Sequence, residues 1–249
     1  MDIAEGRHKE PDNRINVERR VISYPKDKCF QHIARYYDDW TDEYQRPMLY
    51  MENYMPQNLH EFNARKDLSM GTKLSWLYQL AHVLVYFEKN KIVHIDLKPS
   101  NIVVAKNFFL KVIDFAESII KDEKDFKNEK RATTMPFSSP ESLLENIDGI
   151  GYESDVFSFA HIAYELIGGK LMVGFKRSSE NKVRQKYKKK TYKLLPIVNW
   201  LNFQGPQYLM QYMYFVIMLC CTPDPSCRFP QDVLVSFIKD YALFSEKLF

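Results

Sequence analysis

One short stretch of the chain combines three side chains that can act together on a phosphate group. Residues 94–101 read His-Ile-Asp-Leu-Lys-Pro-Ser-Asn and place an acid (Asp96), an ammonium group (Lys98) and an amide (Asn101) close together. A second acid, Asp114, follows further along. Phosphoryl transfer requires a carboxylate that accepts a hydroxyl proton, a lysine that neutralises phosphate charge and oxygen ligands for magnesium. The pattern therefore indicates phosphoryl-transfer chemistry.

The segments around this stretch have the periodicity of regular structure. Residues 74–88 carry apolar side chains at helical spacing, which predicts a long helix before it. Strands are predicted where apolar and aromatic residues gather in short runs, at 33–40, 47–52, 91–94, 102–105 and 110–113. Helical patterns mark the remaining elements, at 59–63, 142–146, 155–167, 206–221 and 230–244.

The order of these elements predicts the fold class. Strands come first and helices dominate after residue 140, which is typical of an α+β fold with two lobes. The boundary is expected near residues 53–58. A chain of 249 residues with 45% hydrophobic and 14% aromatic residues can bury a core of that size.

Composition points to an intracellular protein. The first 13 residues are polar, so no secretory signal is visible, and the longest apolar stretch, 208–221, is shorter than the roughly twenty residues of a membrane span. The four cysteines lack zinc-type spacing and are expected to be free thiols in a reducing compartment. We expect a cytoplasmic, soluble protein with no membrane partner. The mild net charge of +3 argues neither for nor against nucleic-acid binding, and we expect no specific nucleic-acid partner.

Residues 176–193 form a basic segment, which contains nine lysines and arginines and a single acid, Glu180. One interpretation is a solvated loop. The alternative is a docking surface for an acidic partner or substrate, or weak binding of polyanions.

Residues 94–101, taken with Asp114-Phe115, resemble the catalytic loop and metal-binding turn of the eukaryotic protein kinases, of serine/threonine type. The resemblance implies ATP and Mg²⁺ as cofactors and protein hydroxyls as substrates. It implies that Asp96 is the catalytic base and that Lys98 stabilises the transferred phosphoryl group. Asn101 and Asp114 are implied as the metal ligands.

Three downstream matches extend the resemblance over most of the chain. Thr133–Glu141 resembles the end of the activation segment, and it places Thr134 where a threonine bonds to the catalytic aspartate and lysine. Asp155 matches the residue that anchors the backbone of the catalytic loop. Arg228 matches a late arginine that pairs with the glutamate at Glu141.

The resemblance also implies an adenine site between the lobes. The hinge strand would end near a gatekeeper at Met51, and the floor of the pocket would come from residues 102–104. The residues implied to contact the nucleotide are Met51, Glu52, Asn53, Tyr54, Lys98, Asn101, Val103 and Asp114.

Two substitutions depart from the family's catalytic motifs. Ile95 replaces the arginine that normally receives a phosphate of the activation segment, which argues against that switch. Ala116 replaces a glycine and resists positive φ, so the turn is expected to flip less freely. His94 and His161 are expected to pack and hydrogen-bond in the core.

The largest departure lies before the hinge. Protein kinases cover the ATP phosphates with a glycine-rich loop and pair a strand lysine with a helix glutamate. Gly6 is the only glycine before Gly71, and Lys9 lies too close to Glu18, the match to the helix glutamate, for the usual geometry. We therefore expect a truncated, β-rich N-lobe over residues 1–54 and a helical C-lobe over 55–249.

Two functions remain open at this point. The first is a protein serine/threonine kinase, favoured by the set Asp96, Lys98, Asn101, Asp114 and Thr134. The alternative is a catalytically impaired, kinase-like (pseudokinase) module that scaffolds or inhibits another kinase, favoured by the missing glycine-rich loop and lysine. Transfer to a small-molecule hydroxyl is disfavoured by the protein-directed motifs near Glu141 and Arg228.

Overall fold

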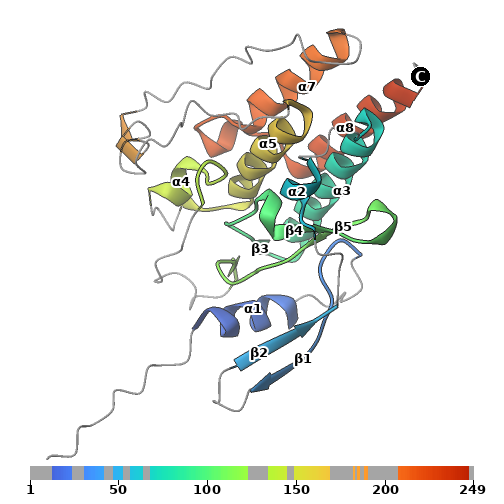
Figure 1. Ribbon diagram of the computed structural model, residues 1–249. Helices are drawn as coiled ribbons and strands as arrows, with labels where there is room; N and C mark the ends of the chain where they lie inside the picture. Colours follow the sequence, from blue (N-terminus) through green and yellow to red (C-terminus); the bar gives the residue numbers. More distant parts are fainter. Residues whose placement is uncertain are drawn as a thin grey trace, which may run out of the picture.

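The computed structural model of the chain describes residues 13–23, 31–41, 47–52, 57–63, 68–122, 134–144, 149–168, 182, 184–185, 188–189 and 207–246. Long helices gather in one large part, while a short helix and a strand pair lie together beside it (Figure 1). Of the basic segment 176–193, only residues 182, 184, 185, 188 and 189 are described. The proposed lobe boundary partly falls on residues 53–56, outside the described ranges, so the division into 1–54 and 55–249 stays a prediction.

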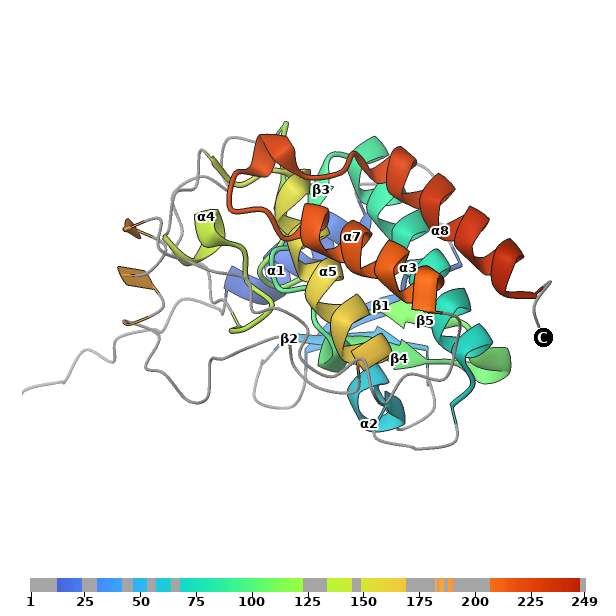
Figure 2. The same cartoon turned by 90° about the horizontal axis from the view of Figure 1, so that it is seen from above.

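Four long helices form the large part, and they lie side by side in two perpendicular views (Figures 1 and 2). Helix α3 packs against both α8 and α5, and α5 also packs against α7. All four were predicted from apolar spacing, and each lies within four residues of its expected ends. Their bounds are Met70–Lys89 (α3), Tyr152–Gly168 (α5), Gln207–Cys220 (α7) and Gln231–Glu246 (α8).

Helix α3 is the central element of this core. It begins at a capping residue, because the hydroxyl of Ser69 accepts a hydrogen bond of 3.1 Å from the backbone N–H of Thr72. At its other end the N–H of Asn90 donates to the carbonyl of Tyr86. Trp76, the largest fully buried side chain, donates its indole N–H to the Phe108 carbonyl and so satisfies its one polar group.

Short strands pair in three antiparallel sheets of two strands each within the described ranges. Strand β1 pairs with β2, β3 with β6, and β4 with β5. The strands are Tyr36–Thr41 (β1), Pro47–Met51 (β2), Ile92–Val93 (β3), Ile102–Val104 (β4), Leu110–Val112 (β5) and Ile119–Ile120 (β6). The shorter helices are Asn13–Ser23 (α1), Leu59–Asn63 (α2) and Pro140–Leu143 (α4), with the 3-10 turns Pro99–Asn101 (η1), Lys106–Phe108 (η2) and Pro225–Cys227 (η6). The prediction of residues 59–63 as a helix is confirmed.

Two predicted boundaries were wrong. Residues 33–35 do not belong to β1, because the His32 carbonyl accepts from Val112 N–H at 2.9 Å and Ala34 N–H donates to Val112 at 3.0 Å. This segment is thereby joined to β5 in the large part. The predicted helix at 142–146 is instead α4, which begins earlier because the Ser139 hydroxyl caps the N–H of Ser142 and a proline follows it. Strand β6 was not predicted.

No helix within the described ranges is long and apolar enough to cross a membrane. Two of the cysteines, Cys220 and Cys221, are buried free thiols, and Cys227 is an exposed one. Burial raises the pKa of Cys220 to about 12, which keeps it protonated. Cys29 lies outside the described residues.

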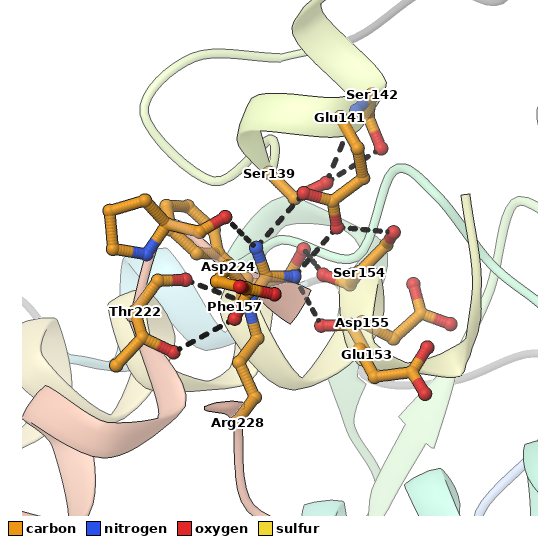
Figure 3. A network of polar contacts seen from close by, with 12 residues as sticks. Ser139, Glu141, Ser142, Glu153, Ser154, Asp155, Phe157, Thr222, Asp224 and Arg228 are labelled. Atoms are coloured by element: carbon orange, nitrogen blue, oxygen red, sulfur yellow. Dashed lines mark hydrogen bonds and ion pairs between the residues drawn. The ribbon is translucent and has the colours of Figure 1, made fainter. Parts of the chain in front are cut away.

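A buried ion pair joins segments that are far apart in the chain (Figure 3). The Arg228 guanidinium donates to both carboxylate oxygens of Glu141, at 2.6 and 2.9 Å, and its side chain has no exposed surface. It also donates to the carbonyls of Glu153 and Thr222 and lies over the ring of Phe157, 5.0 Å from its centroid. The predicted pairing of Glu141 with Arg228 is confirmed, and it holds α4 against α5 and the turn before α8.

Replacing Arg228 by methionine is expected to lower the free energy of unfolding by about 3–5 kcal/mol, because the buried Glu141 carboxylate loses its counter-charge. The double variant Arg228→Met/Glu141→Leu should regain part of that loss, since no unpaired charge remains. Urea unfolding followed by circular dichroism measures both. Lys239→Met, at an exposed position of α8, is the control and should change stability by less than about 0.5 kcal/mol. A double variant no more stable than the single one would contradict this interpretation.

Candidate active site

The loop that follows β3 is held by a carboxylate from α5. Asp155 accepts hydrogen bonds from the backbone N–H groups of His94, at 2.7 Å, and Ile95, at 2.9 Å. Ile95 has a φ of 69°, a conformation that is unfavourable for a β-branched residue. Its side chain is buried, so packing and the bond to Asp155 offset the backbone strain. The predicted anchoring role of Asp155 agrees with this geometry.

Burial dominates the electrostatics of this anchor. It raises the pKa of Asp155 to about 7, although the two backbone N–H groups favour the ionised form. Burial also lowers the pKa of His94, whose Nε2 lies 3.2 Å from the Ile113 carbonyl and whose ring packs 4.9 Å from that of Phe115. In α5, burial lowers the pKa of His161 to about 4, and its Nδ1 bonds the Phe157 carbonyl. Both histidines are core residues, as predicted.

Lys98 connects the loop to the activation segment. Its Nζ donates to Asp96 Oδ2 at 2.5 Å and to Thr134 Oγ1 at 2.8 Å. Thr134 lies 36 positions from Lys98 in the chain, so only the fold brings the three together. The side chains of Asp96 and Lys98 are about one-tenth and one-fifth exposed. A partly buried carboxylate beside an ammonium group can accept a proton from a hydroxyl placed against it.

Asn101 joins the loop to the second acid. Its Nδ2 donates to the Asp96 carbonyl at 3.0 Å and more weakly to Asp96 Oδ2 at 3.3 Å. The backbone carbonyl of Asn101 accepts a hydrogen bond of 3.0 Å from the N–H of Ile113, the residue before Asp114. Because the amide nitrogen serves Asp96, the Oδ1 oxygen is the atom of Asn101 that can bind a cation.

Asp114 is exposed and sits in the left-handed region with a φ of 65°. Aspartate adopts this region more readily than most residues. Ala116 stands where the family carries a glycine. It is not among the described residues with a positive φ, so the turn does not require alanine to adopt that unfavourable conformation.

The donor set of Asn101 and Asp114 fits magnesium. Mg²⁺ is commonly held by one or two side-chain oxygens together with waters and phosphate oxygens of the substrate, and does not need a cage of protein ligands. No cluster of three or more His, Cys, Asp or Glu side chains suited to a metal occurs in the part of the chain that the structure describes.

Helix α1 reaches the same turn from the other side. Glu18 Oε1 accepts from the Tyr36 hydroxyl at 2.7 Å and from Phe115 N–H at 3.3 Å. Burial raises the pKa of Glu18, and the negative charge of Asp114 raises it further. The helix glutamate implied by the family resemblance therefore faces the metal-binding turn and is hydrogen-bonded there to a tyrosine.

The adenine side is described only in part. Met51 is 37% exposed at the end of β2, and Glu52 N–H donates to the Arg35 carbonyl at 2.8 Å. The N–H of Glu52 therefore bonds within the protein. Val103 is partly exposed in β4. Asn53 and Tyr54 lie outside the described residues.

Sequence reasoning missed Tyr36 as a residue of the site. A tyrosine in a short apolar and aromatic run is typical of a strand, and nothing in its neighbours indicates a bond to a helix. The match of Glu18 to the helix glutamate was the one available signal, because a buried carboxylate requires a donor.

Comparison with known proteins agrees with this arrangement. The family model described as "Protein kinase domain" matches residues 3–236. The chain therefore belongs to the protein kinase family.

Several curated proteins are similar to the chain over parts of its length. It is 33% identical over 139 residues to the G-type lectin S-receptor-like serine/threonine-protein kinase SRK of Arabidopsis thaliana, covering 53% of this chain and 16% of that protein. It is 26% identical over 210 residues to the dual specificity protein kinase zak2 of Dictyostelium discoideum, covering 82% and 28%. It is 31% identical over 117 residues to the serine/threonine-protein kinase par-4 of Caenorhabditis elegans, covering 46% and 19%. The chain thus spans less than a third of the length of each.

The anchor at Asp155 predicts a specific dependence of stability on pH. Its pKa lies at about 7 in the folded chain against an ordinary 3.8, so between these values the folded state binds more protons than the unfolded state. The stability that Asp155 contributes should therefore fall as pH rises through this range.

Asp155→Asn removes this titration, and it also leaves one loop N–H without an acceptor. The difference in free energy of unfolding between wild type and Asp155→Asn is expected to shrink as pH rises from about 4 to about 7. Urea unfolding at several pH values measures it, with Asp240→Asn, at an exposed position of α8, as the control. A difference that stays constant over this range would refute the assignment.

Proposed function

We propose that the chain is a protein serine/threonine kinase that transfers the γ-phosphate of ATP to protein hydroxyls. The observation that carries this proposal is the joint contact of Lys98 with Asp96 and Thr134, at 2.5 and 2.8 Å. A base, a phosphate-binding cation and the activation segment meet there, and Asn101 ties the same aspartate to the turn that carries Asp114. The names of the relatives in Arabidopsis and Caenorhabditis include serine/threonine kinase activity, which supports the substrate class.

Each residue then has a distinct role in the transfer. Asp96 orients the acceptor hydroxyl and takes its proton, and Lys98 stabilises negative charge on the phosphoryl group. Thr134 holds the ammonium group of Lys98 in place. Asn101 Oδ1 and the Asp114 carboxylate would hold Mg²⁺, which would supply positive charge against the ATP phosphates.

The nucleotide would lie between β2 and β4. The carbonyl of Glu52 and the hinge groups of Asn53 and Tyr54 would accept and donate the adenine hydrogen bonds, and Met51 and Val103 would pack against the ring. We further propose a cytoplasmic location, and an acidic protein partner for the basic segment 176–193.

A second function is favoured by a different observation. Glu18, the match to the glutamate that usually pairs with a strand lysine, bonds the Tyr36 hydroxyl and the Phe115 N–H. A pseudokinase module, which scaffolds or inhibits another kinase without transferring phosphate, has no need of that lysine. The two functions are separated by their response to Mg-ATP.

Asp96→Asn should lower magnesium-dependent phosphate transfer from labelled ATP by about 10²–10⁴-fold, because the acceptor hydroxyl loses its base. The same variant should still gain thermal stability from Mg-ATP, since the metal ligands remain. Asp114→Asn should lose both transfer and this stabilisation.

Asp122→Asn, in an exposed turn, is the matched control and should behave like wild type in both assays. Equal transfer by wild type and Asp96→Asn would point to a contaminating kinase and reject the enzyme. Wild-type protein that is not stabilised by millimolar Mg-ATP would favour the pseudokinase module.

A further inference from the structure

A side chain from the small part of the molecule holds a backbone N–H of the Asp114-Phe115 turn. The Phe115 N–H donates to Glu18 Oε1 at 3.3 Å. The hydroxyl of Tyr36 in turn donates to the same Glu18 oxygen at 2.7 Å. The three side-chain and backbone groups thus form one connected unit, which we call the Tyr36–Glu18 clasp.

The clasp joins three separate chain segments. Glu18 comes from α1, Tyr36 is the first residue of β1, and the turn follows β5. The segment just before β1 is already paired with β5 through His32, Ala34 and Val112, so the position of Tyr36 relative to the turn is set by backbone hydrogen bonds. The Tyr36 hydroxyl therefore reaches Glu18, which bonds the turn, from a strand whose start is fixed.

The conformation of Asp114 explains what the clasp does. With a φ of 65°, this residue is in a sparsely populated region and persists there only where the surroundings determine it. The hydrogen bond from the Phe115 N–H to Glu18 holds the residue next to Asp114, while the Asp114 side chain stays exposed.

We propose that Tyr36 and Glu18 are positioning residues that hold the Asp114-Phe115 turn in the conformation that presents Asp114 to magnesium. Neither side chain is required to touch the metal or the nucleotide. In this arrangement Glu18 acts through a tyrosine hydroxyl and a backbone N–H. The inference about magnesium rests on the proposed kinase function, whereas the effect on the turn does not.

The direct test is amide hydrogen exchange of the full chain without nucleotide, followed by NMR. Tyr36→Phe removes only the hydroxyl, so Glu18 loses the donor that orients it, and exchange at the Phe115 amide should speed up by about 5- to 30-fold. Glu18→Ala should speed exchange at the same amide. Glu18→Gln keeps an acceptor oxygen and should restore much of the protection.

Tyr37→Phe is the matched control, because it deletes the same hydroxyl from a neighbouring side chain that is 63% exposed. It should leave exchange at the Phe115 amide unchanged. Tyr36→Phe and Tyr37→Phe should also melt at similar temperatures without ligand, which separates positioning of the turn from loss of overall stability.

The consequence for magnesium is measured separately. Tyr36→Phe should raise the KM for Mg-ATP about 5- to 30-fold and leave kcat at saturating Mg-ATP much less affected, since the bound metal itself restores the turn.

Unchanged exchange at the Phe115 amide in both Tyr36→Phe and Glu18→Ala would overturn the proposal. Higher activity of Tyr36→Phe than of wild type would also overturn it, because the clasp would then block the site. If wild type binds no Mg-ATP, the kinase function fails, and the exchange experiment still decides whether the clasp holds the turn.

Discussion

The carboxylate of Asp155 is the constraint on which the catalytic loop depends. It comes from the buried helix α5 and holds two consecutive N–H groups of the loop, while Ile95 adopts a φ that its branched side chain disfavours. A loop held only by its own residues would relax from that conformation. Because α5 packs between α3 and α7, the rigidity of the helical core is passed through one side chain to the backbone that carries Asp96 and Lys98.

Contacts between distant segments then complete the site around this loop. Lys98 reaches Thr134, and the segment that carries Thr134 leads directly into α4, where Glu141 is paired with Arg228. The substitution Ile95 fits this arrangement, because a buried apolar side chain packs where an arginine would require an anionic partner. Thr134 is thus held by Lys98 and by its connection to α4, which the Glu141–Arg228 pair fixes. Neither contact requires a phosphate group.

The small part of the molecule acts on the site through Glu18 and Tyr36. A partly buried carboxylate needs donors, and here a tyrosine hydroxyl and a backbone N–H supply them. The same bonds tie α1 to the turn that carries Asp114, so the arrangement of α1 and the geometry of this turn are coupled. A chain that lacks a recognisable glycine-rich loop can still keep this coupling, which is why family membership and catalytic competence are separate questions for this protein.

The sequence by itself determined the family and the four long helices, and it predicted Asp96, Lys98, Asn101 and Asp114 as site residues, because these features depend on local spacing and on motifs within short stretches. It also indicated Asp155, Glu141 and Arg228 by resemblance. Only the tertiary structure decided that residues 32–34 pair with Val112 of β5, and that the Tyr36 hydroxyl donates to Glu18. Glu18 and Phe115 lie 97 positions apart, and Glu18 and Tyr36 lie 18 apart. Hydrogen bonds over such separations depend on how packed elements meet in space, and no local pattern of residues encodes them.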